Sequence, residues 1–167
     1  MKKEFSVIPR NLILVYNKDK ILLQKGHKNK RDWANMYNGL GGHIEKGEDI
    51  FDSAARELHE EGGIAFPVNQ FLLKGIFSVK TYFNDYCLMF IFSLHTDRKD
   101  FTANEEGSLK WIKIRNLDKM KNVAEDIKFL VPVIQKLNTY EMLSGTSEYN
   151  TNRKLIRFDY SILGYEY

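Results

Sequence analysis

The chain has 167 residues, of which 43% are hydrophobic and 28% are charged, and its formal net charge is +3. This length favours one domain with a substantial core, and the near balance of acids and bases alone gives no reason to expect a nucleic-acid-binding protein. The longest apolar run, residues 87–94, is far shorter than the roughly 20 residues of a membrane helix, so no membrane partner is expected.

Cellular location is indicated by the single cysteine and by the N-terminus. Cys87 has no partner for an intrachain disulfide, which favours a reducing compartment. The opening segment, MKKEFSVIPRN, lacks the apolar core of a signal peptide. The expected location is therefore the cytoplasm.

Aliphatic runs near the N-terminus predict strands. Residues 4–8 are expected to form a short strand that Pro9 ends, and residues 11–16 and 21–25 are expected to pair as a hairpin. Residues 26–37 are polar and basic without periodicity, and they predict a loop.

Six basic side chains lie between residues 18 and 31. A solvated surface is the plain interpretation of most of them, and the alternative is that some of them bind phosphate groups. Lys25 is the candidate for phosphate binding, because the end of a strand positions a side chain more firmly than a loop does.

A glycine-rich segment, Asn38-Gly39-Leu40-Gly41-Gly42, follows the loop. It predicts a turn, and it would also let a backbone carbonyl approach a metal or ligand closely, since no Cβ intervenes. Asn38 at its start offers both a hydrogen-bond donor and an acceptor.

A helix is predicted from Asp49 as N-cap to the Gly62-Gly63 pair. Asp52 resembles the second half of a capping box. Residues 50, 54 and 58 give the helix an apolar face for the core.

Three carboxylates of this helix, those of Glu57, Glu60 and Glu61, share one face because they stand at i, i+3 and i+4. They repel one another unless a cation lies among them. Hard oxygen ligands gathered in this way suit Mg²⁺ or Mn²⁺.

The second half of the chain predicts more strands and one more helix. Residues 98–107 are expected to form a charged loop that carries Glu105 and Glu106. Pro132 lies inside the predicted helix of residues 125–137 and indicates a kink or a late start there. The predicted strands are residues 71–80, 86–95 and 109–114 and a terminal hairpin of residues 142–149 and 154–162; the predicted helix is residues 125–137. This order favours a single α/β or α+β domain with helices packed on a mixed sheet.

The spacing around the acidic helix resembles a known family signature. The chain matches the Nudix box at every defined position of residues 42–64. The matching residues are Gly42, then after five residues Glu48, after seven more Arg56-Glu57-Leu58, after one more Glu60-Glu61, and after one more Gly63-Ile64. The resemblance implies a Nudix-type α/β/α sandwich over residues 1–167, with a mixed sheet that carries the box helix and a second helix.

The family resemblance also implies roles for the box residues. Hydrolysis would use Mg²⁺ or Mn²⁺, with Glu57, Glu60, Glu61 and the Gly41 carbonyl as metal ligands. Arg56 would hold box carboxylates by ion pairing, and Gly42, Gly47 and Gly63 would serve backbone geometry.

Two questions about the acids stay open at this point. Glu48 could help to hold a metal, position water, or only pair with Arg56. The general base could be Glu105 or Glu106, which stand where relatives supply an extra acid, although both could equally be solvated loop residues.

The segment WANMYNGLGGHIEKGE resembles the MutT-type branch, which cleaves purine triphosphates including 8-oxo-dGTP. In that branch an Asn before the glycine turn reads the base, and Asn38 matches it. An acidic pair lies before the second helix, where this chain has Glu125-Asp126; the alternative for Asp126 is a helix N-terminal acid favoured by the dipole. The chain departs from the branch at Val123-Ala124, where relatives often have Trp-Pro.

The leading hypothesis is therefore a metal-dependent enzyme that hydrolyses a nucleoside triphosphate, with an oxidised purine such as 8-oxo-dGTP as substrate, to nucleoside monophosphate and pyrophosphate. The alternatives are a Nudix hydrolase of RNA 5′ ends, dinucleotides or nucleotide sugars, and a non-catalytic nucleotide-sensing module. An intact box disfavours the sensing module. No stable nucleic-acid binding is expected, and a monomer and a homodimer are both compatible with the sequence.

Overall fold

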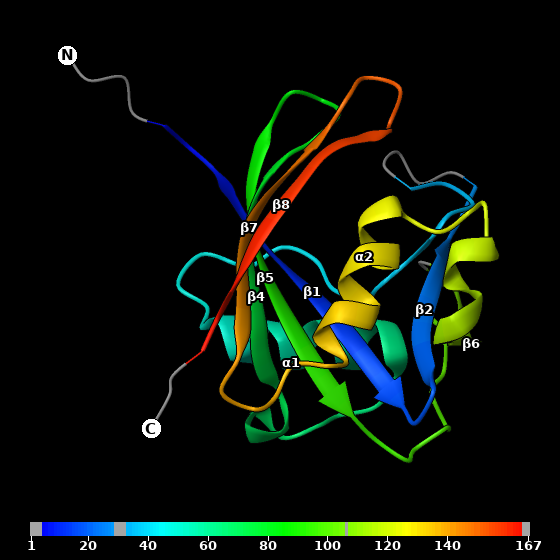
Figure 1. The fold of residues 1–167 in the computed structure, drawn as a ribbon. Coiled ribbons are helices and arrows are strands. Elements are labelled where there is room, and N and C mark those ends of the chain that lie inside the picture. The colour runs from blue at the N-terminus through cyan, green and yellow to red at the C-terminus, as the bar shows by residue number, and fades with distance from the viewer. Residues whose placement is uncertain (1–4, 29–32, 106, 165–167) are drawn as a thin grey trace.

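A single mixed sheet organises the computed structural model, which describes residues 5–28, 33–105 and 107–164 (Figure 1). The sheet has eight strands in the order β3-β2-β1-β5-β4-β7-β8, and β6 pairs with β2 outside this path. The strands are β1 (Ile8–Asn17), β2 (Lys20–Gly26), β3 (Tyr37–Asn38), β4 (Leu72–Lys80), β5 (Tyr86–His95), β6 (Gly107–Lys113), β7 (Met142–Tyr149) and β8 (Leu155–Leu163). The helices are α1 (Ile50–Gly62) and α2 (Glu125–Ile134), and two 3-10 helices are η1 (Val68–Gln70) and η2 (Ile114–Lys119).

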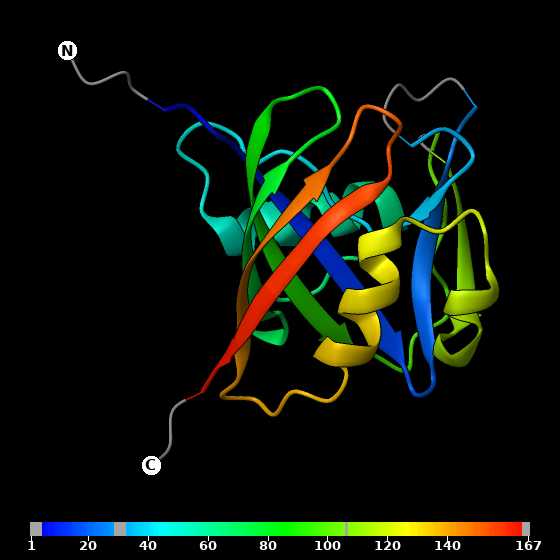
Figure 2. The same ribbon diagram turned by 45° about the horizontal axis from the view of Figure 1, so that its top comes forward.

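The two α-helices cover opposite faces of the sheet, α2 in front of β1 and α1 behind it in Figure 2. Alternation along β1 explains this arrangement, because successive side chains of a strand point to opposite faces. Leu12 and Leu14 pack in the core that includes α2, whereas Ile13 and Val15 pack in the core that includes α1. The predicted α/β/α sandwich is confirmed.

The sheet is mixed because β1 pairs in parallel with β5 and β4 pairs in parallel with β7, while the other ladders are antiparallel. Strand β5 lies between β1 and β4, as expected for an apolar run that is buried on both faces. The predicted terminal hairpin is also present, as β7 and β8.

Strands β1 and β2 diverge, and this divergence positions the glycine-rich segment. The two strands pair only where residues 15–17 meet residues 20–22. Farther along, β2 pairs with β3, while β1 hydrogen-bonds to the glycine segment, with Ile13 N donating to Leu40 O at 2.7 Å and Asn11 N to Gly42 O at 2.9 Å. The segment of residues 37–43 is therefore wedged between the two strands.

Three predicted elements need correction. Residues 5–7 are not a strand, and residue 4 lies outside the described residues; β1 begins at Ile8 and continues through Pro9, which is tolerated near the start of a strand. The predicted loop of residues 26–37 ends in β3, which is too short to leave a sequence pattern. Helix α2 starts at Glu125, as predicted, so the alternative of a late start is wrong. It ends at Ile134, two residues after Pro132 and three residues earlier than predicted.

The ends of α1 are those that the sequence predicts. The Asp49 side chain accepts a hydrogen bond from Phe51 N, and Gly63 caps the C-terminus with a φ of 71°, in the left-handed region that favours glycine. Asp52 is the acidic residue of the first turn. Across the described residues, no helix combines the length and the apolar character needed to cross a membrane.

Gly145 in β7 offers a test of the close packing between the terminal hairpin and the sheet. A Cβ there would overlap the backbone oxygen of Asp159 and lie 2.6 Å from the Phe77 ring. We expect Gly145→Ala to lower the free energy of unfolding by about 1–3 kcal/mol, because overpacking forces the backbone to shift. Urea denaturation would measure it against Ser144→Ala at the exposed neighbouring position; equal values for the two variants would contradict this packing.

Candidate active site

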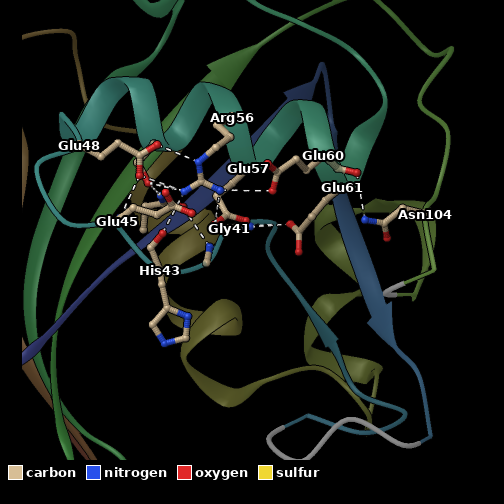
Figure 3. A network of polar contacts seen from close by, with 12 residues as sticks. Gly41, His43, Glu45, Glu48, Arg56, Glu57, Glu60, Glu61 and Asn104 are labelled. Carbon is tan, nitrogen blue, oxygen red and sulfur yellow. Dashed lines mark hydrogen bonds and ion pairs between the residues drawn. The ribbon is translucent and has the colours of Figure 1, made fainter.

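The guanidinium of Arg56 is the centre of a partly buried polar network between α1 and the loop that precedes it (Figure 3). Its Nε lies 2.8 Å from Glu48 Oε1, and its NH1 lies 3.0 Å from Glu57 Oε1 and 3.2 Å from Glu60 Oε2. Its NH2 donates to the His43 backbone oxygen at 3.1 Å. One cation therefore holds three carboxylates and the loop that precedes the helix, which is the role predicted for Arg56.

Glu48 accepts hydrogen bonds from two residues, Arg56 and Glu45. Arg56 bonds both of its oxygens, and Glu45 N donates to Oε2 at 2.9 Å. These interactions, above all the hydrogen bond from Arg56, hold the pKa of Glu48 at about 2, well below its ordinary value. Glu48 therefore carries a charge at neutral pH, and it closes the loop of residues 43–48 onto α1.

Glu57 and Glu61 reach toward the glycine segment from α1. Glu61 is almost fully buried, and its Oε2 accepts a hydrogen bond from Gly41 N at 2.7 Å. At Gly42 a Cβ would come within 2.5 Å of Glu57 Oε1, so a side chain there would displace this carboxylate. A glycine at position 42 therefore leaves room for the Glu57 carboxylate next to the backbone.

Glu60 is the exposed member of the three, with 55% of its side chain accessible. The backbone oxygen of Glu60 accepts a hydrogen bond from Asn104 Nδ2 at 2.9 Å, which ties the loop before β6 to the end of α1. Glu105, next to Asn104, is exposed in this loop. Glu106, the other acid predicted there, lies outside the described residues.

Asn11 fastens the glycine segment to α1. It is 3% exposed, its Oδ1 accepts from Gly42 N at 3.2 Å, and its Nδ2 donates to Ser53 Oγ at 2.8 Å. Sequence reasoning missed this residue. The available signal was an amide at the start of the otherwise aliphatic run NLILVY.

The carboxylates lie around Arg56 and Gly41 without forming a closed metal cage. Among the described residues, no group of three or more His, Cys, Asp or Glu side chains is gathered closely enough to hold a metal ion as the side chains now lie. The donor set itself consists of carboxylate oxygens, which are the ligands that Mg²⁺ and Mn²⁺ prefer.

A cavity of about 410 Å³ adjoins this network. Its size is that of a small-molecule site. Gly41, which bonds Glu61, and His43, whose carbonyl bonds Arg56, belong to its wall. The aromatic residues of the wall are Trp33, Tyr82, Phe83, Tyr86 and Tyr149.

Three of the predicted substrate-binding residues line this cavity together: Asn38, Glu125 and Asp126. The Asn38 Oδ1 accepts from Gly39 N at 2.8 Å, and Glu125 Oε2 accepts from Leu155 N at 2.7 Å, which ties α2 to the terminal hairpin.

Asp126 is half-buried as a residue, and its carboxyl group is the enclosed part. This desolvation raises the pKa of Asp126, although hydrogen bonds from Tyr149 and from Ile127 N oppose the shift. The bond to Ile127 N also makes Asp126 a residue of the first helical turn, as the alternative interpretation expected.

Lys25 is separated from these residues. In β2 it pairs with Tyr37 of β3 and with Ser108 of β6, and it does not belong to the wall of the cavity. Arg10, which sequence reasoning did not single out, does line the cavity. No sequence signal distinguished it from the other basic residues.

Known proteins resemble this chain over most of its length. A model of the NUDIX domain matches residues 9–132. The uncharacterized Nudix hydrolase YvcI of Bacillus subtilis (strain 168) is 28% identical over 145 residues, which make up 84% of this chain and 85% of that protein. The MutT protein from Bacillus halodurans has a similar crystal structure, with a TM-score of 0.75 and 24% identity over 92% of this chain and 97% of the other.

Two relatives carry a more specific name. The oxidized purine nucleoside triphosphate hydrolase of Danio rerio is 29% identical over 128 residues, which are 75% of this chain and 78% of that protein. The Mus musculus protein of the same name is 43% identical over 54 residues, a segment that spans 32% of this chain and 33% of the mouse protein.

The Arg56 network predicts a pH-dependent contribution to stability. We expect Arg56→Gln to lower the free energy of unfolding by about 1–3 kcal/mol at neutral pH, because charge-assisted hydrogen bonds are lost and carboxylates repel one another. Since the pKa of Glu48 falls from 4.5 to about 2 on folding, its stabilisation is present above pH 4.5 and is lost as the pH falls toward 2.

The measurement is chemical denaturation of the wild type and of Arg56→Gln from neutral pH down toward about pH 2 in metal-free buffer. The difference in their free energies of unfolding should become smaller in acid. Arg98→Gln is the matched control, because the ion pair of Arg98 with Asp100 is exposed and its loss should lower the free energy of unfolding much less. A difference that stays constant with pH would contradict the role of Glu48.

Proposed function

Because this chain belongs to the Nudix family and is a Nudix hydrolase, we propose that it hydrolyses a nucleoside triphosphate to nucleoside monophosphate and pyrophosphate. We expect residues 1–167 to act as a single domain. The observation that carries the proposal is the position of Gly41, which bonds Glu61 of the acidic helix and lines the cavity that also contains Asn38 and Asp126.

Nudix hydrolases generally use divalent metal ions, and the residues of α1 fit such a cation by their chemistry. Glu57, Glu60 and Glu61 would hold Mg²⁺ or Mn²⁺, with the Gly41 carbonyl as a further oxygen ligand. The bound cation would neutralise the phosphate oxygens and favour attack by water.

The protein's own contribution is positioning. Arg56 offsets the repulsion among the box carboxylates and fixes Glu48, and Gly42 leaves Glu57 room beside the glycine segment. Glu105 is our candidate for general base, because its loop is bonded to the end of α1 through Asn104.

The cavity is the proposed nucleoside site. Aromatic walls suit stacking with a base, and the amide of Asn38 and the carboxyl groups of Glu125 and Asp126 can exchange hydrogen bonds with base edges. The names of the Danio rerio and Mus musculus relatives favour an oxidised purine such as 8-oxo-dGTP. We also propose a cytoplasmic location, which the single cysteine of the sequence, Cys87, favours.

A substrate panel tests the proposal. We expect pyrophosphate, rather than phosphate, to be released from 8-oxo-dGTP and from unmodified purine triphosphates when Mg²⁺ is present, and no release after chelation. Turnover of 5′-triphosphorylated RNA, dinucleotides or nucleotide sugars, with triphosphates left intact, would reject the proposed substrate class while keeping the hydrolase.

The acidic face of α1 yields a direct prediction. We expect Glu60→Gln and Glu61→Gln to reduce metal-dependent turnover by about 10- to 100-fold or more. Both variants should remain folded, since the amide oxygen introduced by Glu61→Gln can still accept the hydrogen bond from Gly41 N and since Glu60 is exposed.

The control is Asp52→Asn, which removes a charge from an exposed position of the same helix. Initial rates over a range of Mg²⁺ concentrations, together with circular dichroism, would separate loss of metal from loss of fold. Wild-type rates in both Glu variants would remove these residues from the metal site.

A further inference from the structure

Arg10 is a charged residue of the cavity whose side chain no described residue neutralises. It is half-buried, and its guanidinium makes no hydrogen bond or ion pair with any residue that the structure describes. The other arginine of the wall, Arg153, lies over the Tyr82 ring at 4.9 Å. Arg10 is therefore the cation that a ligand in the cavity can engage.

The strand register places Arg10 among apolar neighbours. It follows Ile8 and precedes Leu12 on the α2 face of β1, and it stands opposite Met89 of β5. A half-buried charge beside such side chains loses hydration without gaining a partner, so an apolar residue would stabilise the fold better. A half-buried charge in a cavity wall can recover a partner from a bound ligand of opposite polarity.

Asp126 supplies an opposite charge in the same part of the cavity. The thiol of Cys87 reports on both residues: burial raises its pKa to about 11, while Arg10 lowers this pKa and Asp126 raises it. Cys87 pairs with Ile8, two residues before Arg10 in β1. Arg10, Asp126 and the buried Cys87 all line this cavity.

A 6-oxopurine presents matching groups. Guanine offers the O6 acceptor at one edge, where arginine binds it in many protein complexes, and N–H donors beside it that a carboxylate accepts. Adenine has an amino group in place of O6. This group is a hydrogen-bond donor, so it cannot accept a hydrogen bond from the guanidinium. Guanine and 8-oxoguanine share the O6 acceptor, so both can accept a hydrogen bond from Arg10 at O6.

We propose that Arg10 is a specificity-determining residue that donates to O6 of a 6-oxopurine base and so selects guanine-type over adenine-type nucleotides. This inference rests on the proposed function to the extent that the cavity holds the nucleoside. It assigns the base-reading cation to β1, a strand that the sheet holds on both sides, between β2 and β5.

The first test is binding of dGMP and dAMP in metal-free buffer, measured by calorimetry. Wild-type protein should prefer dGMP, and Arg10→Met should weaken dGMP binding by about tenfold or more while changing dAMP binding less than about threefold. Arg115→Met is the matched control, because Arg115 is exposed in η2 and outside the cavity; it should bind both nucleotides as the wild type does.

Arg10→Lys refines the test, since it keeps the charge and loses the planar fork. It should recover only part of the preference for dGMP. Equal loss of dGMP and dAMP binding in Arg10→Met would assign Arg10 to a phosphate or to the fold, and would overturn the proposal. Wild-type protein that binds dAMP as well as dGMP would overturn it too.

Kinetics separate this inference from the proposed function. For dGTP, Arg10→Met should raise KM with little change in kcat, and for dATP it should leave both constants near the wild-type values. If no triphosphate is hydrolysed but dGMP binding still depends on Arg10, the proposed function fails and the inference stands. If triphosphates are hydrolysed with base preference unchanged in Arg10→Met, the inference alone fails.

Discussion

The ion pairs of Arg56 are the interaction on which the candidate site depends. The carboxylates of Glu48, Glu57, Glu60 and Glu61 would repel one another. Glu57 and Glu61 among them are largely withdrawn from water. Arg56 offsets this repulsion and, through the His43 carbonyl, also attaches the loop to the helix. A helix that carries its own counterion can keep its carboxylates concentrated before any metal binds, at a cost in stability that Arg56 limits.

The divergence of β1 and β2 connects this helix with the cavity. If the two strands paired throughout, the sheet would separate the α1 face from the α2 face completely. Because residues 37–43 fill the opening, Gly41 contacts a carboxylate of α1 and also lines the cavity. Asn11 keeps this segment in place from the buried side. The proposed nucleotide, with its base in the cavity and its phosphates near α1, would extend across the glycine segment.

The sequence predicted the parts of this architecture that depend on local rules. The strands formed by the aliphatic runs near the N-terminus, the Asp49 cap and the Gly63 cap each follow from short-range physics, and the box spacing identified α1 as the acidic helix. Asn11 and Arg10 were missed because their roles depend on contacts with segments far away in the chain. For the same reason Lys25, chosen as the end of a strand, lies outside the cavity wall: the register with Tyr37 and Ser108 decides its surroundings.

Two adjacent residues of β1, Arg10 and Asn11, contact different parts of the structure. Arg10 and Asn11 point to opposite faces of the sheet, so Asn11 reaches Ser53 of α1 while Arg10 faces the cavity beneath α2. A shift of β1 by one residue would exchange these two side chains and would remove the support of the glycine segment together with the cation of the cavity. The long parallel ladder with β5, from Ile8 to Tyr16, fixes this register. The strand register thereby determines that Asn11 contacts the acidic helix and that Arg10 faces the proposed base pocket.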